Sequence, residues 1–99
     1  MSAIHYSTAK AGLIGFTGAL AREVGARGIR VNAICPGAIE TPMTNNVPEP
    51  VMKGMIAATP LRRMGRADEI ASAALFLASD ESAFITGQYI SPNGGIFIG

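Results

Sequence analysis

The sequence predicts an α/β fold, because segments with helical and strand periodicity alternate along the chain. Apolar residues recur every three or four positions over about residues 4–24, which predicts a long helix. The apolar stretch 29–35 predicts a strand buried on both faces, and the alternation near 88–91 predicts a second strand. Strands separated by helices pair in parallel through a right-handed crossover. The chain is therefore expected to form one end of an α/β sheet.

Two further helices are expected between these strands. Residues 36–50 contain four prolines, so they predict a loop of functional length rather than an ordinary connector. A short helix over about 49–58 should follow, with apolar residues on one side. After the basic turn LRRMGR, a clear helix is expected over about 67–78, with Asp68 and Glu69 in its first turn, where they suit the helix dipole. Residues 80–82 close it.

The small side of the first helix and the composition both suggest contact with another surface. Each of Gly12, Gly15 and Gly18 weakens a helix by about 1 kcal/mol relative to Ala, which favours close packing of another helix there. The chain has 99 residues, of which 48% are hydrophobic and 15% charged. So short a chain buries only about 60–65% of its unfolded surface. We therefore expect the sequence to be a piece of something larger.

Several classes of function are excluded by charge and composition. The net charge is +1 and the basic residues are dispersed apart from Arg62, Arg63 and Arg66, so no nucleic-acid footprint is expected. Apolar runs are too short for a membrane span and the start has no secretory pattern, so the cytoplasm is expected. The one cysteine, Cys35, excludes an intrachain disulfide and is expected to fill a buried space. With one His and one Cys, no metal site is expected.

Tyr6 and Lys10 form the first candidate for chemistry. Residues four apart lie on one face of a helix, with Cβ atoms about 5–6 Å apart, so both side chains can act on one bound molecule. A cation beside a phenol favours the phenolate, and such a tyrosine can serve as a general acid or base. A surface pair with the ring over the lysine stem is the alternative from spacing alone.

The order of motifs resembles the C-terminal part of short-chain dehydrogenases/reductases. A Tyr-x-x-x-Lys motif is followed by Asn-x-x-x-Pro-Gly at the end of a strand, a Thr four residues later, Ile-Thr-Gly-Gln and a final Gly-Gly. The resemblance runs from Tyr6 to Gly95 and is strongest to 3-oxoacyl-[acyl-carrier-protein] reductases. It implies the C-terminal part of a Rossmann-like doubly wound parallel sheet, ordered as helix, strand, helical lid, helix and strand.

The resemblance implies the catalytic roles. Tyr6 would protonate the carbonyl oxygen as hydride arrives from the nicotinamide, or act as the base in the reverse direction. Lys10 would hydrogen-bond the nicotinamide ribose and stabilise the tyrosinate. The substrate would be a carbonyl compound or secondary alcohol, either free or linked to an acyl carrier. Arg62, Arg63 and Arg66 either attract such an acidic carrier or form a solvated turn.

The resemblance also implies a cofactor site for NAD or NADP. Pro36 and Gly37 would line the nicotinamide, the backbone of Ile39 would hold its carboxamide, and the Thr41 hydroxyl would reach the carboxamide or pyrophosphate. Residues 43–60 would form a lid over the substrate. The long helix would serve subunit packing, and Gly94-Gly95 a second subunit contact, so a homo-oligomer, a dimer or tetramer, is expected for a complete protein.

Parts of the family's site are not found in these residues. Its Gly-rich dinucleotide loop, its Asn-Asn-Ala-Gly segment and its catalytic Ser all precede the Tyr, so residues 1–99 are expected to be a single partial domain without the N-terminal dinucleotide-binding part. The glycines of the long helix cannot replace that loop. Two hypotheses remain open: a C-terminal portion of an NAD(P)-dependent oxidoreductase, or a non-catalytic truncated fragment or oligomerisation module.

Overall fold

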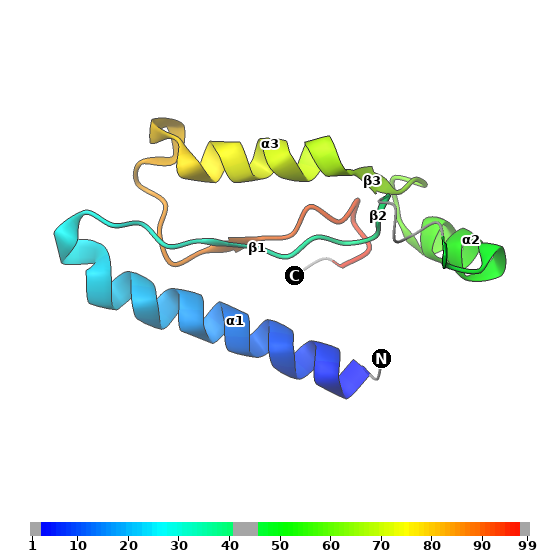
Figure 1. Cartoon of the computed structure of the whole chain (residues 1–99), viewed down its shortest axis with the longest axis horizontal. Coiled ribbons are helices and arrows are strands. Elements are labelled where there is room, and N and C mark those ends of the chain that lie inside the picture. Colours follow the sequence, from blue (N-terminus) through cyan, green and yellow to red (C-terminus); the bar gives the residue numbers. More distant parts are fainter. Residues whose placement is uncertain (1–2, 41–45, 98–99) are drawn as a thin grey trace. The chain divides into compact units, whose positions relative to one another are not determined.

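The computed structural model describes residues 3–40 and 46–97 (Figure 1). The chain divides into two compact units, Met1–Cys35 with Phe76–Ile90 and Pro36–Leu75 with Ser91–Gly99. Each unit has its own pair of parallel strands. The expectation of a single partial domain over the whole chain stays a prediction.

The first unit contains the long helix and the pair of strands that the sequence predicted. Its strands run side by side in parallel, with Ala33 opposite Tyr89 and Ile34 opposite Ile90 (Figure 1). This pairing confirms the parallel arrangement expected for a crossover connection. The elements of this unit are α1 (Ala3–Val24), the 3₁₀ helix Gly25–Arg27, β1 (Ala33–Ile34), the 3₁₀ helix Asp80–Ser82 and β4 (Tyr89–Ile90).

The predicted strand 29–35 is wrong in its length and burial. Only Ala33–Ile34 is regular strand, and Ile29 is 48% exposed. Before Ala33, the backbone pairs through a side chain as well as through the main chain: Val31 N–H donates to the Thr86 hydroxyl at 3.0 Å, and Gly87 N–H donates to the Val31 carbonyl at 2.7 Å. Mixed pairing of this kind is not a regular ladder, so the alternation of apolar residues overstated the strand.

One face of α1 packs against the turn that leads into β4. Thr17, Ala21 and Val24 are buried on this face. A Cβ at Gly87, whose φ is +73°, would lie 3.4 Å from Ala21 Cβ and 3.9 Å from Gly18 Cα. The close approach expected at Gly18 is therefore made by a glycine turn rather than by a helix. At Gly12 and Gly15 nothing among the described residues comes within 4 Å of a Cβ position.

Arg30 binds the segment before β1 to residues 79–85, which follow α3. Its guanidinium donates to the Ser82 hydroxyl at 3.1 Å, to the Ile85 carbonyl at 3.2 Å and to the Ser79 carbonyl at 3.0 Å. Ser82 is 1% exposed. Three charge-assisted bonds from one planar group fix both position and orientation.

The second unit contains the two shorter helices, whose predicted bounds are confirmed. Proline at the start of α2 suits the first helical turn, where an N–H has no partner within the helix. Two short strands were not predicted, because two-residue strands carry no periodicity. The elements are β2 (Ile39–Glu40), α2 (Glu49–Ala58), β3 (Gly65–Arg66) and α3 (Ala67–Ala78), which enters the first unit at Phe76.

The predicted apolar side of α2 is only half-buried. Val51 is 52% exposed, and Met52, Met55 and Ile56 are intermediate in exposure.

Within the described parts of the chain, no helix has the length and apolarity that a membrane crossing requires.

Candidate functional site

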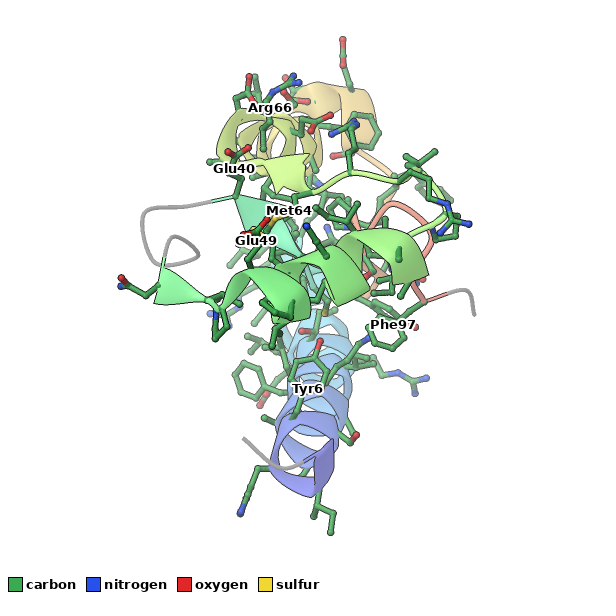
Figure 2. All side chains as sticks on the ribbon, turned by 90° about the vertical axis from the view of Figure 1, so that its right-hand side faces the viewer. Tyr6, Glu40, Glu49, Met64, Arg66 and Phe97 are labelled. Atoms are coloured by element: carbon green, nitrogen blue, oxygen red, sulfur yellow. The ribbon has the colours of Figure 1, made fainter. Side chains whose placement is uncertain are left out.

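Tyr6 and Lys10 lie on α1, in the first unit. The helix begins at Ala3 and runs without interruption past both residues, so the one-turn spacing predicted from the sequence is confirmed. The Tyr6 side chain is 41% exposed and Lys10 is half-buried. Figure 2 shows Tyr6 near the N-terminal end of the helix. This position leaves the phenol accessible from outside α1.

Pro36, Gly37 and Ile39 lie in the second unit, on the segment that leads into β2. Gly37 N–H donates to the Pro92 carbonyl at 3.2 Å. A Cβ at Gly37 would lie 2.7 Å from the Cβ of Asn93 and 2.8 Å from its Cα. Any larger residue would have to displace one of the two segments, that around Gly37 or that around Asn93. Gly37 is thus held against residues 92–93.

The pairing of β2 with β3 determines which way the backbone of Ile39 faces. Ile39 lies opposite Gly65 in a parallel register, and Gly65 N–H donates to the Ala38 carbonyl at 2.9 Å. Backbone groups of successive strand residues point to opposite edges, so the N–H and carbonyl of Ile39 point away from β3. One donor and one acceptor at this edge match the two needs of a primary carboxamide.

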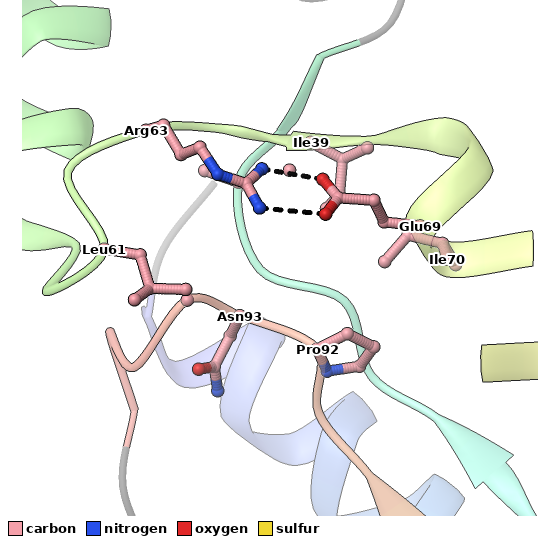
Figure 3. A pocket seen from close by; sticks show the side chains of 10 residues that line it. Ile39, Leu61, Arg63, Glu69, Ile70, Pro92 and Asn93 are labelled. Atoms are coloured by element: carbon pink, nitrogen blue, oxygen red, sulfur yellow. Dashed lines mark hydrogen bonds and ion pairs between the residues drawn. The ribbon is translucent and has the colours of Figure 1, made fainter. Parts of the chain in front are cut away.

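The carboxylate of Glu69, on the first turn of α3, accepts three hydrogen bonds. Arg63 donates to both oxygens, at 2.7 and 2.8 Å (Figure 3). Arg66 N–H donates to one of them at 2.9 Å. The bond from Arg63, and then that from Arg66 N–H, lower the pKa of Glu69 from 4.5 to about 2. Hydrogen bonding to the same carboxylate raises the pKa of Arg63.

This ion pair was not predicted. The sequence placed Glu69 in the first helical turn and Arg63 in a basic turn, as separate features. The signal that could have joined them is an arginine six residues before a glutamate at the third position of a helix, where a carboxylate reaches back to cap the N-terminus.

A cavity of about 220 Å³ lies in the second unit beside the ion pair (Figure 3). The Ile39 side chain forms part of its wall and is close to β3, since a Cβ at Gly65 would lie 2.8 Å from Ile39 Cδ1. The cavity is therefore lined both by the segment that contains Ile39 and by the Arg63–Glu69 ion pair. Its lining residues are Ala38, Ile39, Leu61, Arg63, Gly65, Glu69, Ile70, Pro92, Asn93 and Gly94.

The remaining predicted site residue, Thr41, lies outside the described residues, as do the first residues of the expected lid, 43–45. The described part of that lid, 46–60, contains α2. The structure brings Tyr6 and Lys10 together on one helix, and brings Pro36, Gly37 and Ile39 together on one segment of the other unit.

Comparison with known proteins identifies the family. A family model described as enoyl-(acyl carrier protein) reductase matches residues 1–96. The chain belongs to the short-chain dehydrogenases/reductases. It is 52% identical over 94 residues to the 3-oxoacyl-[acyl-carrier-protein] reductase of Escherichia coli strain K12, covering 95% of this chain and 38% of that protein. It is 55% identical over 98 residues to the acetoacetyl-CoA reductase of Shinella zoogloeoides, covering 98% and 41%.

Solved structures of short-chain dehydrogenases/reductases confirm the α/β fold class. A crystal structure of a 3-oxoacyl-[acyl-carrier protein] reductase from Brucella melitensis ATCC 23457 matches with a TM-score of 0.92 at 44% identity, over 96% of this chain and 35% of that one. A second Brucella melitensis structure, titled as a short-chain dehydrogenase/reductase, matches with a TM-score of 0.86 at 43% identity, over 96% and 38%. The chain thus spans well under half the length of these relatives, and corresponds to part of their Rossmann-like fold.

Proposed function

We propose that this chain carries the proton-transfer end of an NAD(P)-dependent oxidoreductase that interconverts a carbonyl and a secondary alcohol. The observation that carries the proposal is the pair Tyr6 and Lys10, one turn apart on α1. The pair occurs in a chain 52% identical to a 3-oxoacyl-[acyl-carrier-protein] reductase. Since the chain spans 38% of that relative, residues outside these 99 would complete the site.

Tyr6 would hold and transfer the proton of the reaction. When bound, the nicotinamide supplies hydride to the carbonyl carbon or accepts it in the reverse direction. In reduction, Tyr6 donates its phenolic proton to the carbonyl oxygen, and the resulting tyrosinate is stabilised by the Lys10 ammonium. The proton on Tyr6 is then restored from solvent. Lys10 would also bind the nicotinamide ribose.

The segment 36–40 fits the nicotinamide end of NAD or NADP. The backbone N–H and carbonyl of Ile39 face away from β3, as a carboxamide partner must. Pro36 is exposed, so a flat ring can approach its side chain. Thr41 would contribute its hydroxyl to the carboxamide or pyrophosphate. Residues 43–60 would cover the substrate.

The substrate class we propose is a 3-oxoacyl thioester. The two relatives are named as a 3-oxoacyl-[acyl-carrier-protein] reductase and an acetoacetyl-CoA reductase, and both names describe a ketone at the third carbon of a thioester. We also propose a homo-oligomer, because Leu13 and Phe16 are 45% and 62% exposed on α1, and large apolar side chains favour a partner surface. The predicted cytoplasmic location remains part of this proposal.

Reduction of acetoacetyl-CoA with NADH and NADPH tests the proposal, using the protein as its own cell makes it. Tyr6→Phe should lower kcat by about 10²–10⁴-fold, the usual loss when a general acid is removed, with cofactor affinity unchanged. Tyr89→Phe is the matched control, because Tyr89 is 38% exposed on β4 and has no proposed role. It should retain the wild-type rate.

Two results would overturn the proposal. One is an unchanged rate in Tyr6→Phe. The other is a protein of 10.2 kDa that neither binds NADH or NADPH nor reduces the thioester, but associates with a complete subunit. That second result would establish the oligomerisation module instead.

A further inference from the structure

We infer that Glu69 is a positioning residue for the nicotinamide carboxamide, acting through β3 on the backbone of Ile39. The inference rests on the proposed function, since it assumes that Ile39 faces the cofactor. Glu69 itself contacts neither the cofactor nor the reacting atoms in this account. It sets the position of the strand against which the cofactor segment is aligned.

Glu69 is hydrogen-bonded to β3. Its carboxylate accepts the N–H of Arg66, the second residue of β3, at 2.9 Å. Arg66 N–H lies at the start of α3, where backbone donors have no partner within the helix. A carboxylate at this place both satisfies the donor and suits the positive end of the helix dipole. Glu69 thereby ties the end of β3 to the first turn of α3.

Arg63 fixes the orientation of the Glu69 carboxylate. Arg63 donates to both oxygens of Glu69, in the two-pronged geometry that restricts rotation of each group. Other ion pairs among the described residues lack this geometry: Lys53 meets Glu49 through one contact at 3.2 Å, and Arg66 meets Asp68 through one at 3.1 Å. The side chains of Arg63 and Glu69 are also less exposed, at 49% and 33%.

The pairing of β3 with β2 positions Ile39. Gly65 N–H donates to the Ala38 carbonyl, with Ile39 opposite Gly65 and Glu40 opposite Arg66. Both strands have only two residues, too few for the ladder to hold itself in place, since isolated strand pairs are marginal even when longer. The alignment of Ile39 therefore depends on what anchors β3 as well as on the contact of Gly37 with residues 92–93. Glu69 is an anchor of β3.

The inference predicts an effect on one half of the cofactor only. If Glu69 aligns the carboxamide edge, its loss weakens binding of the nicotinamide end and leaves the adenosine end untouched. A general loss of stability would weaken both. ADP-ribose, which lacks the nicotinamide, separates these two cases.

The binding experiment uses the protein as its own cell makes it, with Glu69→Gln, Glu69→Ala and the control Glu81→Gln. Glu81 is exposed on the 3₁₀ helix Asp80–Ser82 of the first unit. We expect Glu69→Ala to raise the Kd for NADH or NADPH about tenfold, with Kd for ADP-ribose unchanged. Glu69→Gln keeps one acceptor for Arg66 N–H, so a smaller rise is expected. The control should match the wild type.

A second readout needs no cofactor. Hydrogen exchange at the Gly65 amide, which donates to Ala38, should be faster in both Glu69 variants. The Cys35 amide, which donates to the Ile90 carbonyl in the first unit, should exchange as in the wild type. This measurement also applies if Glu69→Ala folds poorly, because Glu69→Gln preserves the shape of the side chain.

The outcomes separate the inference from the proposed function. If the wild type binds NADH and NADPH no more tightly than ADP-ribose, the nicotinamide site itself is wrong, whatever the exchange shows. If the wild type discriminates but the Glu69 variants keep both the discrimination and the slow Gly65 exchange, the positioning role is overturned. Equal weakening of ADP-ribose and dinucleotide binding would also overturn it, since that pattern indicates general destabilisation.

Discussion

Gly37 and Asn93 approach so closely that a Cβ on Gly37 would lie 2.7 Å from the Cβ of Asn93 and 2.8 Å from its Cα. Because a backbone atom is among these neighbours, no side-chain rotation relieves the clash. Gly37→Ala should therefore displace the segment 36–40, lower the free energy of unfolding by about 1–3 kcal/mol, and weaken NADH or NADPH binding. Urea unfolding and a fluorescence titration measure the two effects.

The control for this change is Gly25→Ala. Gly25 begins the 3₁₀ helix after α1, and nothing comes within 4 Å of its Cβ position among the described residues. An alanine there should leave stability and cofactor binding close to wild type. If Gly37→Ala behaves like Gly25→Ala, the contact between residues 37 and 93 does not hold the segment in place.

The ion pair of Glu69 predicts a pH dependence of stability. Its pKa falls from 4.5 to about 2 in the folded chain, chiefly through the hydrogen bonds from Arg63 and then from Arg66 N–H. The unfolded chain thus takes up the proton first as pH falls. The pair's contribution is fully present above about pH 5 and is lost between about pH 4.5 and 2.

Comparison of the wild type with Glu69→Gln isolates this effect from the other carboxyl groups. The difference between their urea midpoints should be constant above about pH 5 and should shrink as pH falls below 4.5. High salt should reduce it, because the pair is partly exposed. A difference that stays constant down to pH 3 would contradict the assigned hydrogen bonds.

Arg30→Ala should destabilise the first unit. Its guanidinium supplies three hydrogen bonds, to Ser79, Ser82 and Ile85. Removing it leaves several of these partly buried acceptors without a charged donor, and the expected loss is about 1–3 kcal/mol. Arg27→Ala is the control, since Arg27 is exposed in the 3₁₀ helix after α1. Equal urea midpoints for the two variants would contradict the role of Arg30.

The helices could be predicted from sequence because each spans several turns of apolar periodicity. The expected bounds 49–58 and 67–78 agree with α2 and α3, and the first helix differs by one residue from α1. The strands could not be predicted as well. β2 and β3 have two residues each and depend on each other for pairing, so neither carries a local pattern. The apolar stretch before β1 pairs partly through Thr86, which no periodicity reveals.

The same contrast applies to the candidate site. The spacing of Tyr6 and Lys10 follows from helix geometry alone, so the sequence was sufficient. The contact of Gly37 with Asn93 and the pair of Arg63 with Glu69 depend on how the turn before α3 and the segment after β4 fold. The carboxamide edge of Ile39 depends on the register of β2 with β3. Such tertiary arrangements are not encoded in spacing.

The most direct test is deuterium transfer to acetoacetyl-CoA from NADH and NADPH that carry two deuterium atoms at C4, catalysed by the protein as its own cell makes it. We expect a 3-hydroxybutyryl thioester with one deuterium at the third carbon, formed at the same rate by the wild type and by Tyr89→Phe and about 10²–10⁴-fold more slowly by Tyr6→Phe. A product without deuterium, or formation of the deuterated product by Tyr6→Phe at the wild-type rate, would contradict the assignment of Tyr6 to a hydride-transfer site.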